Sequence, residues 1–140
     1  MTAYSWMRGS LLLMALAIVG CGGSGDLKTY KIPGKLVYED NSPVPGASLV
    51  FQTSVNGQTV TAQGMANPDG TFQLSTVNPD DGVVAGDHQV SVSPLPAGDG
   101  AAPTTPAVPP VYWELGTSGL TSKVEPSTKE IVITINRQGK

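Results

Sequence analysis

His88 and Cys21 are the only histidine and the only cysteine among the 140 residues, so they are the first candidates for chemistry. Histidine titrates near neutrality, and a small hydrolase with His88 as general base is one hypothesis. The strand-like alternation around His88 opposes it, because His88 shares the apolar face with Val90 and Val92 while the carboxylate of Asp87 lies on the other face. We therefore expect His88 to be packed in the core, and we expect no catalytic residue.

One cysteine and one histidine are too few for a disulfide framework or a zinc site. Carboxylates are more plentiful, since Asp40, Asp69 and the adjacent Asp80 and Asp81 could offer oxygen ligands to calcium. Residues 79–82 nevertheless lack the staggered ligands and the distal glutamate of a calcium loop. We expect turns at these aspartates, and neither a metal ion nor another cofactor.

Two adjacent aromatic residues, Tyr112 and Trp113, follow a proline-rich stretch and lie outside any alternating pattern. Aromatic rings at the edge of a sheet can stack on sugars or anchor a partner protein, so both residues are candidate ligand contacts. In the alternative interpretation, one ring covers the open end of the core and the other lies on the surface. The second interpretation requires nothing beyond the fold itself.

The charge balance excludes one large class of partners. Eight Lys and Arg residues face eleven Asp and Glu residues, which gives a net charge of -3, and no basic block occurs anywhere. A protein that grips phosphate backbones needs a concentrated positive surface. We therefore expect no nucleic acid as partner. At 14% charged and 39% apolar residues, the chain is typical of one small domain with appendages.

The N-terminal residues have the pattern of an export signal. Arg8 precedes nine consecutive apolar residues, 11–19, a run much shorter than the roughly 20 residues that a membrane-spanning helix needs. The run ends at Ile18-Val19-Gly20-Cys21, which resembles the lipobox of bacterial lipoproteins. The resemblance implies that residues 1–20 are a signal peptide, cleaved between Gly20 and Cys21, and that the Cys21 thiol carries a diacylglyceryl group.

Such acylation would make a membrane the first partner of this chain, because each buried methylene contributes about 0.8 kcal/mol and a lipoprotein carries two or three acyl chains. The expected location is the cell envelope, lipid-anchored to a bacterial membrane, with the leaflet left open. Residues 21–29 are rich in glycine and would form a flexible tether between the anchor and the domain.

Residues 30–140 are predicted to form one all-β domain. Twelve of the seventeen glycines and all twelve prolines fall in this part, and between them lie short runs that alternate polar and apolar side chains, as strands with one buried face do. Residues 94–110 form a proline-rich loop. We predict an antiparallel β-sandwich of about seven strands without helices, with strands at residues 34–39, 47–53, 58–66, 71–76, 87–93, 120–124 and 129–135.

Several motifs in order resemble a known family. Gly34-Lys35-Leu36-Val37, Pro43-Val44-Pro45-Gly46-Ala47-Ser48-Leu49-Val50-Phe51, Asn67-Pro68-Asp69-Gly70-Thr71-Phe72 and Gly86-Asp87-His88-Gln89-Val90-Ser91-Val92 are similar to motifs of the carboxypeptidase regulatory-like domains. With the tail, the resemblance covers residues 34–135, and it implies a transthyretin-like sandwich. It also implies an accessory or binding module without catalytic residues of its own. His88 departs from the family, which favours Tyr at that position.

The sequence therefore predicts a non-enzymatic, lipid-anchored module of the cell envelope that makes structural or adhesive contacts with an envelope protein or a glycan. A carbohydrate-binding module that uses Tyr112 and Trp113 is the first alternative. A small hydrolase centred on His88 is the second.

Overall fold

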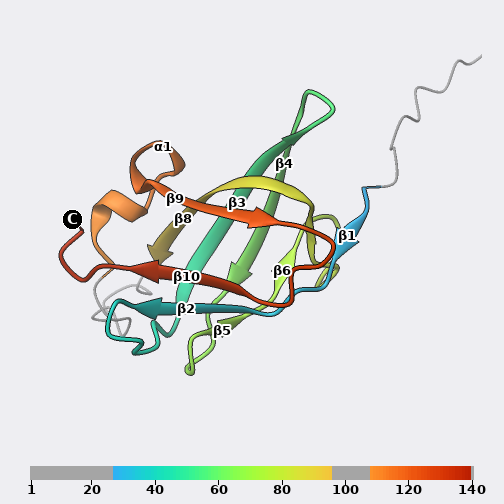
Figure 1. The fold of residues 1–140 in the computed structure, drawn as a ribbon. Coiled ribbons are helices and arrows are strands. Elements are labelled where there is room, and N and C mark those ends of the chain that lie inside the picture. The colour runs from blue at the N-terminus through green and yellow to red at the C-terminus, as the bar shows by residue number, and fades with distance from the viewer. Residues whose placement is uncertain (1–26, 96–107, 140) are drawn as a thin grey trace, which may run out of the picture.

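The computed structural model describes residues 27–95 and 108–139, and β-strands are their main secondary structure (Figure 1). Two short helices, η1 and α1, occur near the C-terminal end. The elements are β1 (Thr29–Tyr30), β2 (Gly34–Tyr38), β3 (Ala47–Val55), β4 (Gln58–Met65), β5 (Thr71–Phe72), β6 (Leu74–Ser75), β7 (Val83–Val84), β8 (Gly86–Pro94), η1 (Pro110–Tyr112), α1 (Leu115–Ser118), β9 (Leu120–Val124) and β10 (Ile131–Ile135).

The largest sheet has five strands in the order β6-β4-β3-β8-β9, and all neighbours are antiparallel. Its centre is the β3–β4 hairpin, whose two-residue turn is Asn56-Gly57. Both turn residues have positive φ, 51° and 78°, as a type I′ turn requires. The predicted strands at 47–53, 58–66, 87–93 and 120–124 are thus confirmed, with ends that differ by at most two residues.

A second sheet has three strands in the order β10-β2-β5. β2 and β10 run parallel, in a register that pairs Gly34 with Ile131 and Tyr38 with Ile135. The prediction of a wholly antiparallel arrangement was therefore wrong. The parallel pairing is possible because β2 and β10 are far apart in the sequence and are not joined by a hairpin turn, so nothing forces them to run in opposite directions.

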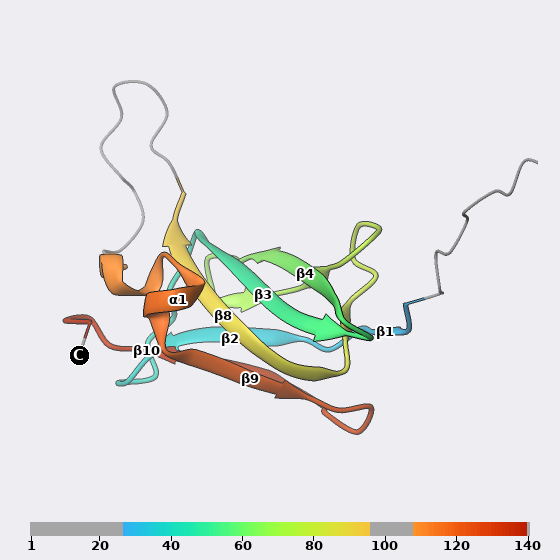
Figure 2. The ribbon, with the colours of Figure 1, turned by 90° about the horizontal axis from the view of Figure 1, so that it is seen from above.

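Side chains from both sheets meet in one core. Burial alternates along β3 and β10, where Ala47, Leu49 and Phe51 and the three isoleucines of β10 are buried, as the alternation of polar and apolar side chains implies. The rings of Phe51 and Phe72 lie 6.0 Å apart between centroids, and they join the five-stranded sheet to the three-stranded one. Figure 2 shows β2 and β10 lying along the sheet that contains β3, β4 and β8.

Three local predictions need correction. The strand expected at 71–76 is divided at Gln73, because β5 pairs with β2 in one sheet and β6 pairs with β4 in the other. No strand was predicted between residues 76 and 87, but this stretch contains β7, which forms a two-stranded ladder with β1. The expected absence of helix is broken by η1 and α1, which lie at the end of the molecule opposite β1 (Figures 1 and 2).

Several predictions concern residues outside the described ranges. These are the signal peptide 1–20, most of the tether 21–29, the lipidation residue Cys21 with the cleavage residue Gly20, and most of the proline-rich loop 94–110. Within residues 27–95 and 108–139, no helix has the length and apolar character needed to cross a membrane.

Candidate functional site

The structure separates the two candidate aromatic residues. Tyr112 ends η1 with its side chain in the core, 7% exposed, and its hydroxyl accepts a hydrogen bond from the backbone N–H of Asn136 at 3.0 Å. Trp113 follows with 46% of its surface exposed, and its Nε1 donates to the carbonyl of Val108 at 2.8 Å. Tyr112 therefore closes the core beside the end of β10, and Trp113 is the member of the pair that offers ring surface to solvent.

The segment that carries Trp113 is held to the five-stranded sheet by α1. The buried Ser118 donates its hydroxyl to the carbonyl of Val90 in β8, and accepts the backbone N–H of Leu120 at 3.2 Å. The Thr117 hydroxyl donates to the carbonyl of Val111 at 2.9 Å, which ties α1 to η1. Because these bonds and the Nε1 bond fix its position, the exposed indole is a preformed contact surface rather than a freely rotating side chain.

His88 lies in the core, as predicted, with 1% of its surface exposed. Its Nε2 is 2.9 Å from the carbonyl oxygen of Val84, and since a carbonyl only accepts, Nε2 carries the proton. Nδ1 is then unprotonated, and it is buried without a hydrogen-bond partner. The imidazole packs edge-on against the ring of Phe51. Burial lowers the pKa of His88 below its ordinary value. In this position the imidazole has no contact with solvent through which it could reach a substrate.

The aspartates that could have held calcium are engaged in turns. Asp69 accepts the backbone N–H and the hydroxyl of Thr71 at 3.0 and 2.6 Å. Asp81 accepts backbone N–H groups of residues 76–78 at 2.7 to 2.9 Å. These hydrogen bonds favour the ionised carboxylates and lower the pKa of both groups.

Asp40 closes the end of the parallel β2–β10 pair. It accepts hydrogen bonds from Ser42 and from the guanidinium of Arg137, at 3.1 Å for Arg137, and these bonds lower the pKa of Asp40 to about 2. The guanidinium also lies 3.8 Å from the ring centre of Tyr38. Among the residues that the structure describes, no three His, Cys, Asp or Glu side chains are grouped so that they could hold a metal ion.

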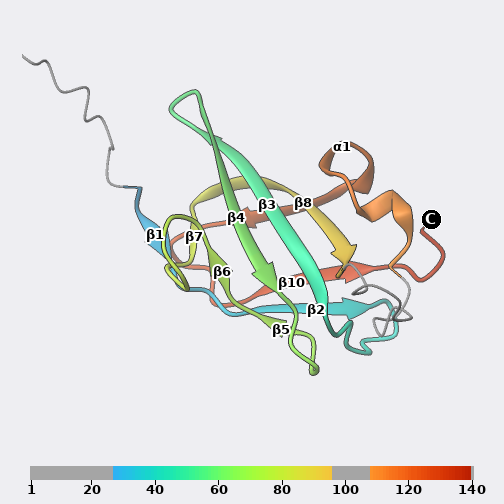
Figure 3. The same cartoon turned by 180° about the vertical axis from the view of Figure 1, so that it is seen from behind.

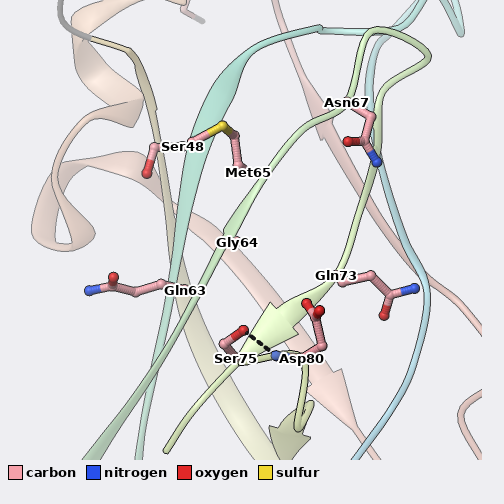
Figure 4. A pocket seen from close by; sticks show the side chains of 8 residues that line it. All are labelled: Ser48, Gln63, Gly64, Met65, Asn67, Gln73, Ser75 and Asp80. Atoms are coloured by element: carbon pink, nitrogen blue, oxygen red, sulfur yellow. Dashed lines mark hydrogen bonds between the residues drawn. The ribbon is translucent and has the colours of Figure 1, made fainter. Parts of the chain in front are cut away.

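A polar groove beside β4 and β6 was not predicted from the sequence (Figure 4). It has a volume of about 510 Å³ and is lined by Ser48, Gln63, Gly64, Met65, Asn67, Gln73, Ser75 and Asp80. A second hollow of about 420 Å³ shares Gln63 and Ser75 with it and continues to the exposed Val77. Amides and hydroxyls dominate both walls, so the groove can donate and accept hydrogen bonds without carrying much charge.

Comparisons with protein-family models, with curated proteins and with solved structures found no match for this chain. The resemblance to carboxypeptidase regulatory-like domains therefore remains a hypothesis that depends on the motifs quoted above. The chemistry that the described residues offer to a partner is an exposed, fixed indole at one end of the molecule and a polar groove at one edge of the larger sheet.

Proposed function

We propose that this chain is a lipid-anchored, non-enzymatic module of the bacterial cell envelope, with a structural role or a role in binding a protein or a glycan. The observation that carries the proposal is the position of the sole cysteine, Cys21, which follows a nine-residue apolar run and Gly20 and precedes a glycine-rich stretch. An acylated cysteine there would hold the domain at a membrane.

The fold that we propose for the domain is a transthyretin-like β-sandwich of the carboxypeptidase regulatory-like kind. Two observations support it: a five-stranded and a three-stranded sheet share one core, and the quoted motifs fall on strands and turns of these sheets. Pro43-Val44-Pro45-Gly46 leads into β3, Asp69-Gly70 precedes β5, and Gly86 begins β8.

The position of Trp113 supports a binding role. Cys21 precedes Thr29, the first residue of β1, by 29 − 21 = 8 residues, which can span at most about 28 Å. The end of the domain with β1 would therefore stay near the acyl chains. Since η1 and α1 lie at the opposite end, Trp113 would be presented away from the bilayer, where it can meet a partner.

Cell fractionation of a Cys21→Ser variant expressed in a bacterial host tests the anchor. We expect the wild-type chain in the membrane fraction and the variant in the soluble fraction, because the hydroxyl does not accept the diacylglyceryl group. Ser24→Ala, three residues further on, is the matched control and should remain in the membrane. A Cys21→Ser protein that stays membrane-bound would contradict the proposal.

A carbohydrate-binding module is the second candidate, and the exposed indole of Trp113 is the observation that favours it. Removal of residues 1–20 would leave Trp113 as the single tryptophan, so its fluorescence would report on the site directly. We expect a glycan that stacks on the ring to change the emission, and Trp113→Phe to weaken binding while Tyr112→Phe has little effect. Unchanged fluorescence across a panel of envelope oligosaccharides would exclude this candidate.

The small hydrolase centred on His88 has the least support. Its general base would have to leave a core position in which Nε2 is already bonded to Val84. If a His88→Phe variant folds and keeps the phenotype of the wild-type chain, this alternative is excluded.

A further inference from the structure

The outer edge of β4 is open over most of its length. All eight residues of β4 pair with β3, whereas on the other side only Gln63 and Gly64 pair with β6. Among the described residues, 58–62 have no strand beside them on that side, and Figure 3 shows β6 next to one end of β4 only. An unpaired edge of this length is a template for the addition of another strand.

Nothing in the sequence of this edge protects it. Natural sheets block exposed edges with charged side chains, proline, bulges or a covering segment. β4 carries no charge and no proline, and no charged residue occurs between Asp40 and Asp69. Thr59, Val60 and Thr61 at the middle of the edge are all β-branched and favour an extended chain. We expect an edge with this composition to pair with another strand.

The turn geometry determines which backbone groups face outward. A two-residue turn makes Val55 and Gln58 a hydrogen-bonded pair, and in an antiparallel ladder such pairs alternate with pairs that exchange no bonds. The N–H and C=O groups of Gln58, Val60 and Ala62 therefore point to β3. Those of Thr59 and Thr61 point to the open edge, so four backbone groups are available there.

We propose that the partner is a second copy of this chain, added antiparallel so that Val60 faces Val60 of the partner copy across a two-fold axis. In this register Thr59 lies opposite the partner's Thr61, and the four outward groups of each copy are satisfied by the four of the other. The two five-stranded sheets become one continuous sheet. The contact is isologous and closes after two copies, which excludes an open fibre.

The length of the open edge fits a second copy better than a foreign strand. The edge begins at Gln58, directly after the turn, and ends at Ala62, where β6 occupies the next position. In the proposed register Gln58 of one copy lies opposite Ala62 of the other, so the turn of each copy reaches Ser75, the last residue of the partner's β6. The hollow there contains Val77, which is 68% exposed in the single chain and would be covered by the partner's turn.

Cysteine trapping tests the two-fold axis directly. Residues that face each other in a pair without hydrogen bonds have Cα atoms about 4.5 Å apart, a distance that a disulfide can bridge. We expect full-length Val60→Cys, purified in detergent and oxidised, to form a covalent dimer that a reductant dissolves. The wild-type chain controls for Cys21. Thr59→Cys should not form the dimer, because Thr59 faces Thr61 of the other copy rather than Thr59.

Charged substitutions at two positions of the edge test the same register without a change in the core. In the double variant Thr59→Lys and Thr61→Lys, like charges lie directly opposite each other, and we expect the dissociation constant of the dimer to rise at least tenfold. In Thr59→Lys with Thr61→Glu, opposite charges face each other and the dimer should persist. Sedimentation of the full-length proteins over a range of concentrations measures both constants, and circular dichroism verifies that both variants fold.

The proposal would be overturned by the absence of a dimer from Val60→Cys, by equal dimer yields from Val60→Cys and Thr59→Cys, or by the same association constant for the two charge variants. Trapping of Val60→Cys on a different protein but not on itself would also overturn it, in favour of a foreign strand at this edge.

Discussion

The two edge regions of the five-stranded sheet differ in how they are protected from pairing with another strand. At one edge β9 carries Lys123, which is 3.1 Å from Glu125, and contacts β10 of the other sheet. At the other edge β4 is uncharged, and β6 covers only two of its residues. Charge and a neighbouring strand thus protect the first edge, whereas the second has neither over residues 58–62. A free edge that lacks both forms of protection indicates an interaction surface rather than a simple end of the sheet.

The largest effect that we predict concerns the short ladder between β6 and β4, at which the open edge of β4 ends. A Cβ atom at Gly64 would lie 2.6 Å from the carbonyl oxygen of Gln73, so Gly64→Ala must push β6 away from β4. We expect a loss of about 1–3 kcal/mol in the free energy of unfolding, measured with urea. Gly116→Ala is the control, since a Cβ there meets nothing within 4 Å. Equal stability of the two variants would show that β6 does not constrain β4.

The next effect concerns the protected edge. Ser118→Ala removes the hydroxyl that bonds Val90 and Leu120, and leaves a buried carbonyl without that partner. We expect a loss of about 1–2 kcal/mol and faster hydrogen exchange in β9, with β4 unchanged. Thr117→Ala, whose hydroxyl is exposed, should cost less. Faster exchange in β4 as well would contradict the view that the two edges are held independently.

A third effect is confined to mildly acidic pH. Burial lowers the pKa of His88 in the folded state, so the unfolded chain binds a proton more readily. The free energy of unfolding should be highest above the ordinary pKa of about 6.5 and fall as the pH decreases below it. A His88→Phe variant should lack this slope, although it shares the losses from carboxylates below about pH 4. Urea unfolding at several pH values measures both slopes, and parallel curves would contradict the prediction.

The smallest effect is expected at Lys123. Both side chains of its ion pair with Glu125 are exposed to solvent, and exposed pairs contribute little, so Lys123→Gln should leave the free energy of unfolding almost unchanged. Lys129→Gln is the control for the loss of one charge. Sedimentation of the variant sharpens the comparison. If it associates through β9, charge alone protects that edge; if it does not, the neighbouring β10 is sufficient.

Periodicity predicted where most strands of this fold lie, because strands such as β3 and β10 bury one face. The alternation of His88, Val90 and Val92 predicted a histidine in the core, and the structure confirms it. Periodicity does not say which strand lies beside which. The transfer from one sheet to the other at Gln73 and the parallel pairing of β2 with β10 depend on contacts distant in sequence, and local patterns carry no signal for them.

The candidate site was predicted only in part for the same reason. Tyr112 and Trp113 were recognised as a pair, but which ring would be buried depends on η1, a single turn that begins at two prolines and has no apolar period. The groove lies beside β4 and β6, and the second hollow continues from it where β6 ends and the chain goes on to Thr76. Its polar residues alternate in the sequence like those of any solvent-facing strand, so nothing distinguished them in advance.

The parallel ladder between β2 and β10 determines how the domain would resist tension. β2 is entered from the N-terminal end of the chain and β10 leads to its C-terminal end, and both strands run in the same direction over five paired positions. Opposite forces applied at the two termini would therefore act along the ladder and load its five pairs together, instead of opening them one after another. If the proposed acyl anchor pulled on the N-terminal end while the C-terminal end was held, the five pairs of this ladder would carry the load in shear.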